Sequence, residues 1–212
     1  MPKDIIAVLR EALGDKAPLP VGEINLVCKI IDEEEPLSVV TSDKLYSLTR
    51  KLRQPVQAIL SYDLGLQALL VLFGRLGHRW LGVLGDLVAE DMNNVAKCVS
   101  LFRQTSSKDT MQLLFFVAHY VKSRHSELFA KEFASQLSRP WTPIGLLLIL
   151  PIFDKDDTAL LGPLKEYLAR LDSPAAAPEL RGSQRQLVAA LKSAMQKIEG
   201  RPQKKWWQFW RQ

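Results

Sequence analysis

Apolar residues recur along most of this chain at intervals of three and four positions, and strict alternation of apolar and polar residues is almost absent. This spacing places apolar side chains on one face of an α-helix, whereas a half-buried strand needs a period of two. In residues 3–13, for example, one helical face carries Ile5, Ile6, Leu9 and Leu13. The pattern predicts an all-α protein, either a multi-helix bundle or a short HEAT-like helical array, with a linked C-terminal amphipathic helix.

Prolines and short polar segments divide this pattern into separate helices. Pro55 predicts the end of a helix that begins with an N-cap at Ser42 or Asp43, because proline lacks the N–H that a helix interior requires. No proline occurs between Pro55 and Pro140, and this interval holds the densest apolar segments of the chain, which predicts the core. The expected helices span about 3–13, 21–31, 42–54, 56–73, 79–103 (with a break near Asp91), 109–122, 126–138, 143–150, 157–171 and 184–199.

Five glycines gather in one part of the predicted core. Two of them, Gly74 and Gly77, predict a turn, because glycine adopts backbone conformations that other residues avoid. The other three, which are Gly65, Gly82 and Gly85, predict places where two helices approach closely.

One pair of similar segments supports the array alternative. The runs Leu69–Phe73 and Leu113–Val117 lie 44 positions apart. That interval matches the length of two-helix repeats of the HEAT or armadillo type, although apolar helices of similar composition also produce such a match.

The composition changes after residue 171. Residues 172–182 are rich in proline and alanine and have little to bury, which is typical of a linker. Ser183 followed by Gln186 forms a capping-box pattern and predicts the start of the next helix. We therefore expect a globular helical domain over 1–171 that folds on its own, a linker over 172–182, and a basic, tryptophan-rich helical tail over 183–212.

The net charge is also divided by position. Residues 181–212 carry eight Lys or Arg residues and one acidic residue, whereas residues 1–180 carry 20 basic and 22 acidic residues. The high pI of 9.2 is thus a property of the C-terminal segment. A basic segment joined to a near-neutral body indicates an anionic partner, such as a membrane surface or a nucleic acid.

The last twelve residues are the most distinctive part of the chain. Three of the five tryptophans fall within the last seven residues, next to several positive charges. At about 100° per residue, a helix here would place its aromatic rings on one side and its basic residues on the other. The candidate binding residues are Arg201, Lys204, Lys205, Trp206, Trp207, Phe209, Trp210 and Arg211.

This composition favours attachment to an anionic membrane surface. Tryptophan places an apolar ring among acyl chains and its N–H among headgroups, while Lys and Arg meet anionic lipids. Two alternatives remain open: the rings could pack in a protein groove, within the chain or on another protomer, or could stack on single-stranded nucleic acid. Nucleic acid fits less well, because the body offers no matching basic face.

The sequence contains no constellation that identifies a reaction. None of the three histidines lies in a nucleophile motif, and no glycine-rich phosphate loop or zinc-protease motif occurs. His119 lies in an apolar run and is expected in the core, whereas His78 and His125 are expected at the surface. If the protein were an all-α enzyme, these histidines and the aspartates at 154, 156 and 157 would be the first candidates for a site assembled from distant residues.

Metal and cofactor sites are not expected. Asp154, Asp156 and Asp157 begin like a calcium-binding loop, but the later glycine and glutamate of that loop are absent, so we expect them to cap the following helix. Cys28 and Cys98 are too far apart for a metal motif, lie in apolar stripes, and are expected in the core. The acidic run at 33–35 and the cluster of Arg50, Lys51 and Arg53 are expected to be solvated helix faces.

These observations predict a non-enzymatic adaptor or regulatory protein with a helical body that binds a protein partner. The tail would recruit it to a membrane or a larger assembly, and homo-oligomers are compatible with the sequence. The few cysteines and the interrupted apolar run near residue 10 indicate a cytoplasmic protein, with peripheral attachment at the inner face of a membrane. The longest apolar stretches fall short of the roughly 20 residues that a transmembrane helix needs.

Overall fold

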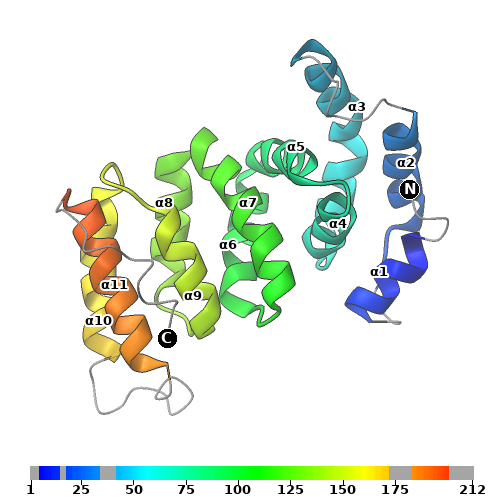
Figure 1. The fold of residues 1–212 in the computed structure, drawn as a ribbon. Coiled ribbons are helices and arrows are strands. Elements are labelled where there is room, and N and C mark those ends of the chain that lie inside the picture. Colours follow the sequence, from blue (N-terminus) through cyan, green and yellow to red (C-terminus); the bar gives the residue numbers. More distant parts are fainter. Residues whose placement is uncertain (1–4, 15–17, 34–41, 172–182, 201–212) are drawn as a thin grey trace. The chain divides into compact units, whose positions relative to one another are not determined.

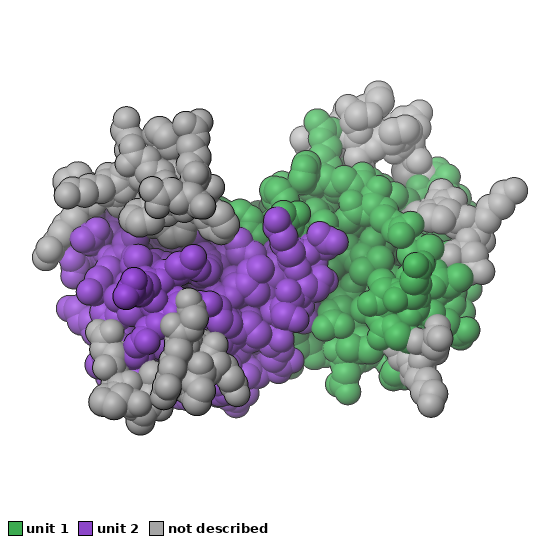
Figure 2. Space-filling model, turned by 60° about the horizontal axis from the view of Figure 1, so that its bottom comes forward, with its two compact units in different colours: residues 1–98, 112–124 green, residues 99–111, 125–212 purple. Residues whose placement is uncertain are grey.

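The computed structural model describes residues 5–14, 18–33, 42–171 and 183–200. Over these residues every regular element is helical, with eleven α-helices and two short 3₁₀ helices, which confirms the all-α prediction (Figure 1). The chain divides into two compact units, coloured separately in Figure 2. Unit 1 comprises residues 1–98 and 112–124, and unit 2 comprises residues 99–111 and 125–212. The choice between a bundle and a repeat array stays a prediction.

Unit 1 is built around α3. This helix packs against α2, and it also contacts α4 and α5, while α1 packs against α4. Most of the apolar positions predicted from the sequence are buried here, with Leu9, Val27 and Leu52 fully enclosed, whereas Ile6 and Leu13 are half-buried. Its complete helices are α1 (Ile5–Leu13), α2 (Val21–Asp32), α3 (Ser42–Leu60), α4 (Gly65–Gly74) and α5 (His78–Ala89), joined by parts of α6 (Met92–Gln104) and α7 (Lys108–Arg124).

Pro55 does not end α3, which corrects the prediction that the helix stops there. The helix runs from Ser42 to Leu60 with Pro55 inside it. A proline inside a helix costs roughly 3 kcal/mol. Here Leu52, Val56 and Ile59 around it are fully buried, and burial of each such side chain contributes about 1.5 to 3 kcal/mol. Tertiary packing therefore outweighs the local cost.

The helix expected over 56–73 is instead broken at residues 61–64. The backbone N–H of Ser61 donates to the carbonyls of Gln57 and Ala58, and the N–H of Gly65 donates to the carbonyl of Tyr62, closing a tight turn before α4. A Cβ at Gly65 would overlap the backbone of Ile59, so the close approach expected at this glycine is confirmed. The turn folds α4 back against α3.

Two interruptions that the sequence predicts, near Asp91 and at Gly74 and Gly77, are confirmed. The helix expected over 79–103 divides between Ala89 and Met92, where the Asp91 carboxylate accepts a hydrogen bond of 2.8 Å from the Asn93 N–H. The turn expected at Gly74 and Gly77 joins α4 to α5, and Gly77 has a φ of 98°, in the left-handed region that favours glycine.

Unit 2 contains a hairpin of two helices. In Figure 1, α10 (Leu161–Leu171) and α11 (Gln184–Ile198) lie side by side, and α11 also packs against α9 (Pro143–Ile149) and η1 (Leu150–Ile152). Lys197 Nζ donates to the Pro151 carbonyl at 2.8 Å, which ties the end of α11 to η1. The remaining elements are α8 (Ser126–Gln136) and η2 (Thr158–Leu160), with parts of α6 and α7.

The apolar face of α11 is buried in unit 2, so ordered packing continues beyond residue 171. Ser183 occupies the predicted N-cap position, but its side chain makes no cap hydrogen bond, and Gln184 Nε2 instead donates to the Leu171 carbonyl. Residues 172–182 lie outside the described residues, so the expected linker and the independent folding of residues 1–171 stay predictions. The buried residues of α11 are Leu187, Ala190, Leu191, Ala194, Met195 and Ile198.

Candidate functional site

The candidate residues of the tail lie outside the described part of the chain. The last helix of that part, α11, ends at Ile198, and Gly200 follows it with a φ of 70°. A glycine in this conformation is a common stop just after a helix. The expectation for Arg201, Lys204, Lys205, Trp206, Trp207, Phe209, Trp210 and Arg211 therefore stays a prediction from sequence.

Within unit 1, exposed aromatic side chains gather on α7 and at the start of α5. The His78 ring lies 4.5 Å from the Phe116 ring, measured between centroids, and Phe115 contacts both Phe116 at 6.2 Å and His119 at 5.0 Å. Phe116 is 37% exposed and Tyr120, one turn further along α7, is 42% exposed. We call this set, His78, Phe115, Phe116, His119 and Tyr120, the aromatic surface.

Two glycines of α5 hold Tyr120 in place. A Cβ at Gly82 would lie 2.8 Å from Tyr120 Cζ, and a Cβ at Gly85 would collide with Tyr120 Cβ and lie 3.2 Å from the Val117 carbonyl oxygen. Only glycine at these two positions lets the tyrosine lie against the helix backbone. This confirms the close approach predicted from the sequence, and it fixes a half-exposed ring on a rigid support.

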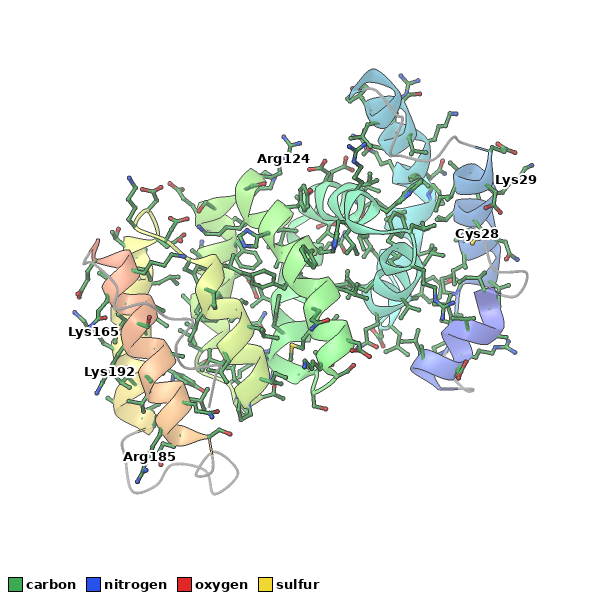
Figure 3. The ribbon with its side chains drawn as sticks, in the orientation of Figure 1. Cys28, Lys29, Arg124, Lys165, Arg185 and Lys192 are labelled. Carbon is green, nitrogen blue, oxygen red and sulfur yellow. The ribbon has the colours of Figure 1, made fainter. Side chains whose placement is uncertain are left out.

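Charged groups frame the aromatic surface. Arg75 and Arg79 are exposed in the α4–α5 turn and at the start of α5, on either side of His78 in the sequence. Arg124, near the end of α7, donates from Nε to Asp86 Oδ1 at 2.9 Å, and this hydrogen bond to a carboxylate raises the pKa of the guanidinium (Figure 3). Asp86 is thereby paired with Arg124, while Arg75 is exposed and contributes positive charge beside the rings.

The predicted position of His119 is wrong. It is exposed on α7 and packs edge-on against Phe115. The run around it reads as wholly apolar, but the buried face of α7 is formed by Met111, Leu114, Val117, Ala118 and Val121. His119 lies off this stripe, together with Phe116 and Tyr120. His78 and His125 are exposed, as predicted.

The aspartates at 154–157 lie in the loop before η2, and Asp157 occupies its N-cap position. Asp157 is 4% exposed and precedes η2, but its side chain caps no helix N–H. Its Oδ2 accepts from the Asp154 N–H at 2.7 Å, and its Oδ1 accepts from Ser126 Oγ at 3.2 Å. The carboxylate thus joins this loop to the start of α8, and it lies at the N-cap position of η2 without a side-chain cap hydrogen bond.

Among the described residues, no group of three or more His, Cys, Asp or Glu side chains could hold a metal ion. Cys28 and Cys98 are both buried, as predicted, and burial raises the pKa of the Cys98 thiol to about 12. Desolvation likewise raises the pKa of Cys28. Arg50, Lys51 and Arg53 lie on an exposed face of α3, as predicted, and Arg53 donates to Glu90 Oε1 at 2.8 Å.

The sequence reasoning missed the aromatic surface as a site. It treated Phe115 and Phe116 as part of a dense apolar segment, although adjacent residues point about 100° apart on a helix and cannot both face one core. Assigning α7 a single buried stripe would have identified Phe116, His119 and Tyr120 as outward-facing residues.

Comparisons with known proteins add no further constraint. No protein-family model matches the sequence, and comparisons with curated proteins and with solved structures give no significant match. No helix in the described part of the chain is both long enough and apolar enough to cross a membrane.

Proposed function

We propose that this chain is a non-enzymatic adaptor or regulatory protein that connects a protein partner to an anionic membrane surface or a larger assembly. The helical body binds the partner, and the basic, tryptophan-rich tail makes the attachment at the inner face of a membrane in the cytoplasm. The observation that carries the proposal is the aromatic surface of unit 1. Rigidly held aromatic rings beside arginines are the side chains most enriched at the energetic centres of protein interfaces.

The aromatic surface also indicates what the partner offers. Phe116 and Tyr120 supply apolar area, while the exposed Arg75 supplies positive charge. A partner segment with apolar side chains and nearby carboxylates would complement both features, since charged groups at a rim favour a partner of opposite sign. A nucleic acid is less well matched, because residues 1–180 carry more acidic than basic residues.

The tail supports the membrane half of the proposal through its composition. Each basic residue near an anionic bilayer contributes about 1 kcal/mol, and each ring that enters the interface adds an apolar contribution. Ordering a short segment offsets much of this gain, because an isolated helix of this length is marginal in water. Attachment would therefore be reversible.

The partner half can be tested by affinity capture with the full chain and a Phe116→Ala/Tyr120→Ala variant. The variant should lose specific partners that the wild type retains, because truncating central interface rings typically costs about 2 kcal/mol or more in binding. Tyr46→Ala is the matched control, since Tyr46 is 73% exposed on α3 and lies outside the aromatic surface. Equal loss in the control and the test variant would contradict the assignment of this surface.

The membrane half is tested with anionic liposomes and two full-length variants. Changing Lys204, Lys205 and Arg211 to Gln should weaken binding mainly at low salt, because added salt screens the same attraction. Changing Trp206, Trp207 and Trp210 to Ala should weaken binding at every salt concentration and abolish the blue shift of tryptophan emission.

Other results would identify the alternatives. If the wild type ignores anionic liposomes and the Trp variant loses thermal stability, the rings pack within the protein. If a co-purifying protein is lost instead, the tail is a partner-docking segment. Retention on single-stranded oligonucleotides in place of liposomes would favour nucleic acid, and a chemical activity lost with His119→Ala would favour the enzyme alternative.

A further inference from the structure

The outward face of α11 forms a narrow stripe of exposed residues. The buried residues of this helix, such as Leu187, Leu191 and Ile198, face the rest of unit 2. At about 100° per residue, the exposed positions on the opposite side fall within roughly 60° of one another. From the start of the helix onward, this stripe consists of Arg185, Ala189, Lys192 and Gln196.

The stripe is basic and contains no acidic residue between Arg185 and Gln196. Ala189, which lies between Arg185 and Lys192, is short, and Gln196, which follows them, is uncharged. Lys165 of α10 is exposed as well, and Figure 3 shows Lys165, Lys192 and Arg185 on the same side of unit 2. We call these three cations and Ala189 the α11 face.

The cations of the α11 face differ from two other exposed cations of the described residues, which form ion pairs. Arg53 is paired with Glu90 at 2.8 Å and Arg124 with Asp86 at 2.9 Å. Lys165, Arg185 and Lys192 form no ion pair with another residue of the described part of the chain. Their charges are therefore available to an external anion. Glu166 and Glu199 lie beside and beyond the stripe, so its attraction is moderate on its own.

The position of the α11 face relative to the tail identifies the anion. The described helix ends at Ile198, and the basic, tryptophan-rich residues begin at 201, only a few residues further along the chain. A surface bound by the tail therefore lies within reach of α11, since each extended residue spans at most about 3.6 Å. A bilayer is flat and extended, so it can meet the tail and a straight helical stripe together.

We propose that the α11 face docks on the anionic bilayer together with the tail, so that α11 lies along the membrane surface. This inference rests on the proposed membrane attachment and adds a folded surface to it. The tail supplies the rings that enter the interface, and Lys165, Arg185 and Lys192 supply charge from a rigid helix pair. Unit 2 is thereby held in one orientation on the membrane.

The test compares full-length proteins on phosphatidylcholine–phosphatidylserine vesicles and on phosphatidylcholine alone. The variant Lys165→Gln/Arg185→Gln/Lys192→Gln should bind the anionic vesicles at least about tenfold more weakly, since about 1 kcal/mol per basic residue is roughly fivefold in the binding constant. The control Arg10→Gln/Arg50→Gln/Lys131→Gln removes the same charge from other exposed positions and should stay within about twofold of the wild type. Both variants should unfold at wild-type denaturant concentrations, because all six side chains are exposed.

A second measurement reports orientation directly. The native cysteines are buried, so a fluorophore on Ala189→Cys labels the α11 face selectively. Lipid-borne quenchers should quench this label in the presence of anionic vesicles and should leave it unquenched in the presence of phosphatidylcholine vesicles alone.

The outcomes separate this inference from the proposed function. If the wild type binds anionic vesicles but the test variant matches the control and the Ala189 label is unquenched, the inference is wrong and attachment by the tail stands. If the wild type does not bind anionic vesicles, the inference and the proposed membrane attachment are both wrong. Binding to a single-stranded oligonucleotide that depends on the same three cations, without vesicle binding, also overturns the inference.

Discussion

Each unit contains a cluster of aromatic rings, and the two clusters differ in where the rings face. In unit 2, Phe133 lies 4.7 Å from Phe153 and 5.2 Å from Trp141, and Phe153 also contacts Phe129 at 5.9 Å. All four of these side chains are buried, and the Trp141 indole N–H donates to the Gln136 carbonyl at 3.0 Å. This cluster is part of a core.

The aromatic surface of unit 1 has similar ring-to-ring distances but faces solvent. His78 and Phe116 are 4.5 Å apart, and both are exposed. Buried rings stabilise the fold because unfolding returns their area to water, whereas exposed rings retain that contribution for a partner. A contact between two rings therefore does not by itself reveal their role. Their burial distinguishes rings that stabilise the fold from rings that are available to bind a partner.

The largest expected effect comes from truncating one ring of each cluster. Phe133→Ala should lower the free energy of unfolding by about 3 to 5 kcal/mol, because it leaves a cavity in a fully buried site. Phe116→Ala should cost about 1 kcal/mol or less, since a partly exposed side chain leaves no enclosed cavity. Urea denaturation of both variants measures the difference, and similar losses would abolish the distinction between the clusters.

The helical fold was predictable because the period of apolar residues is set locally. Breaks at Asp91 and at Gly77 were also predictable, since a capping aspartate and a glycine in the left-handed region act within a few residues. The continuation of α3 through Pro55 was not predictable from local rules, because the packing of Leu52 and Ile59 keeps the helix intact. Tertiary burial overrides a local preference in a way that the sequence pattern does not reveal.

The candidate site could be predicted only in part. The glycines at 82 and 85 indicated a close approach, but the sequence did not show that the approaching residue is Tyr120. The prediction that His119 lies in the core was wrong, because a run of apolar residues indicates the average burial of a segment and not the direction of each side chain. The tail, with its tryptophans and basic residues, was read from composition and remains a sequence prediction.

A second, smaller effect on stability is expected from variants at Gly82 and Gly85, the two glycines of α5 against which Tyr120 packs. Gly85→Ala should destabilise the protein by about 1 to 3 kcal/mol, because the added Cβ meets Tyr120 Cβ and the backbone at Val117, which cannot move easily. Gly82→Ala should cost less, since the Cβ meets the far end of the ring, which can rotate away. Gly22→Ala in α2, where the added methyl meets open space, is the control.

These glycine variants separate stability from binding. Gly22→Ala should raise the free energy of unfolding by up to about 1 kcal/mol, because alanine favours a helix over the unfolded chain. Gly82→Ala should displace the Tyr120 ring and weaken partner capture more than it weakens the fold. If Gly82→Ala and Gly22→Ala gave the same capture result, the position of Tyr120 would not matter to partner binding.

The smallest expected effect concerns a buried ring of unit 2 that can ionise. Desolvation raises the pKa of the Tyr167 phenol above its usual value near 10, although the Arg170 guanidinium, 5.2 Å from the ring centroid, partly opposes the shift. Because the folded protein holds this proton more tightly than the unfolded chain, the stabilisation is complete below about pH 10 and is lost as pH rises through the folded pKa.

Denaturation at pH 8 and at pH 11 should therefore show a larger loss of stability in the wild type than in Tyr167→Phe, which has no phenol to ionise. Other titrating groups are shared by the two proteins and cancel in this difference. An equal loss in both would mean that the Tyr167 phenol reaches water in the folded state, and it would weaken the contrast between the enclosed rings of unit 2 and the exposed rings of unit 1.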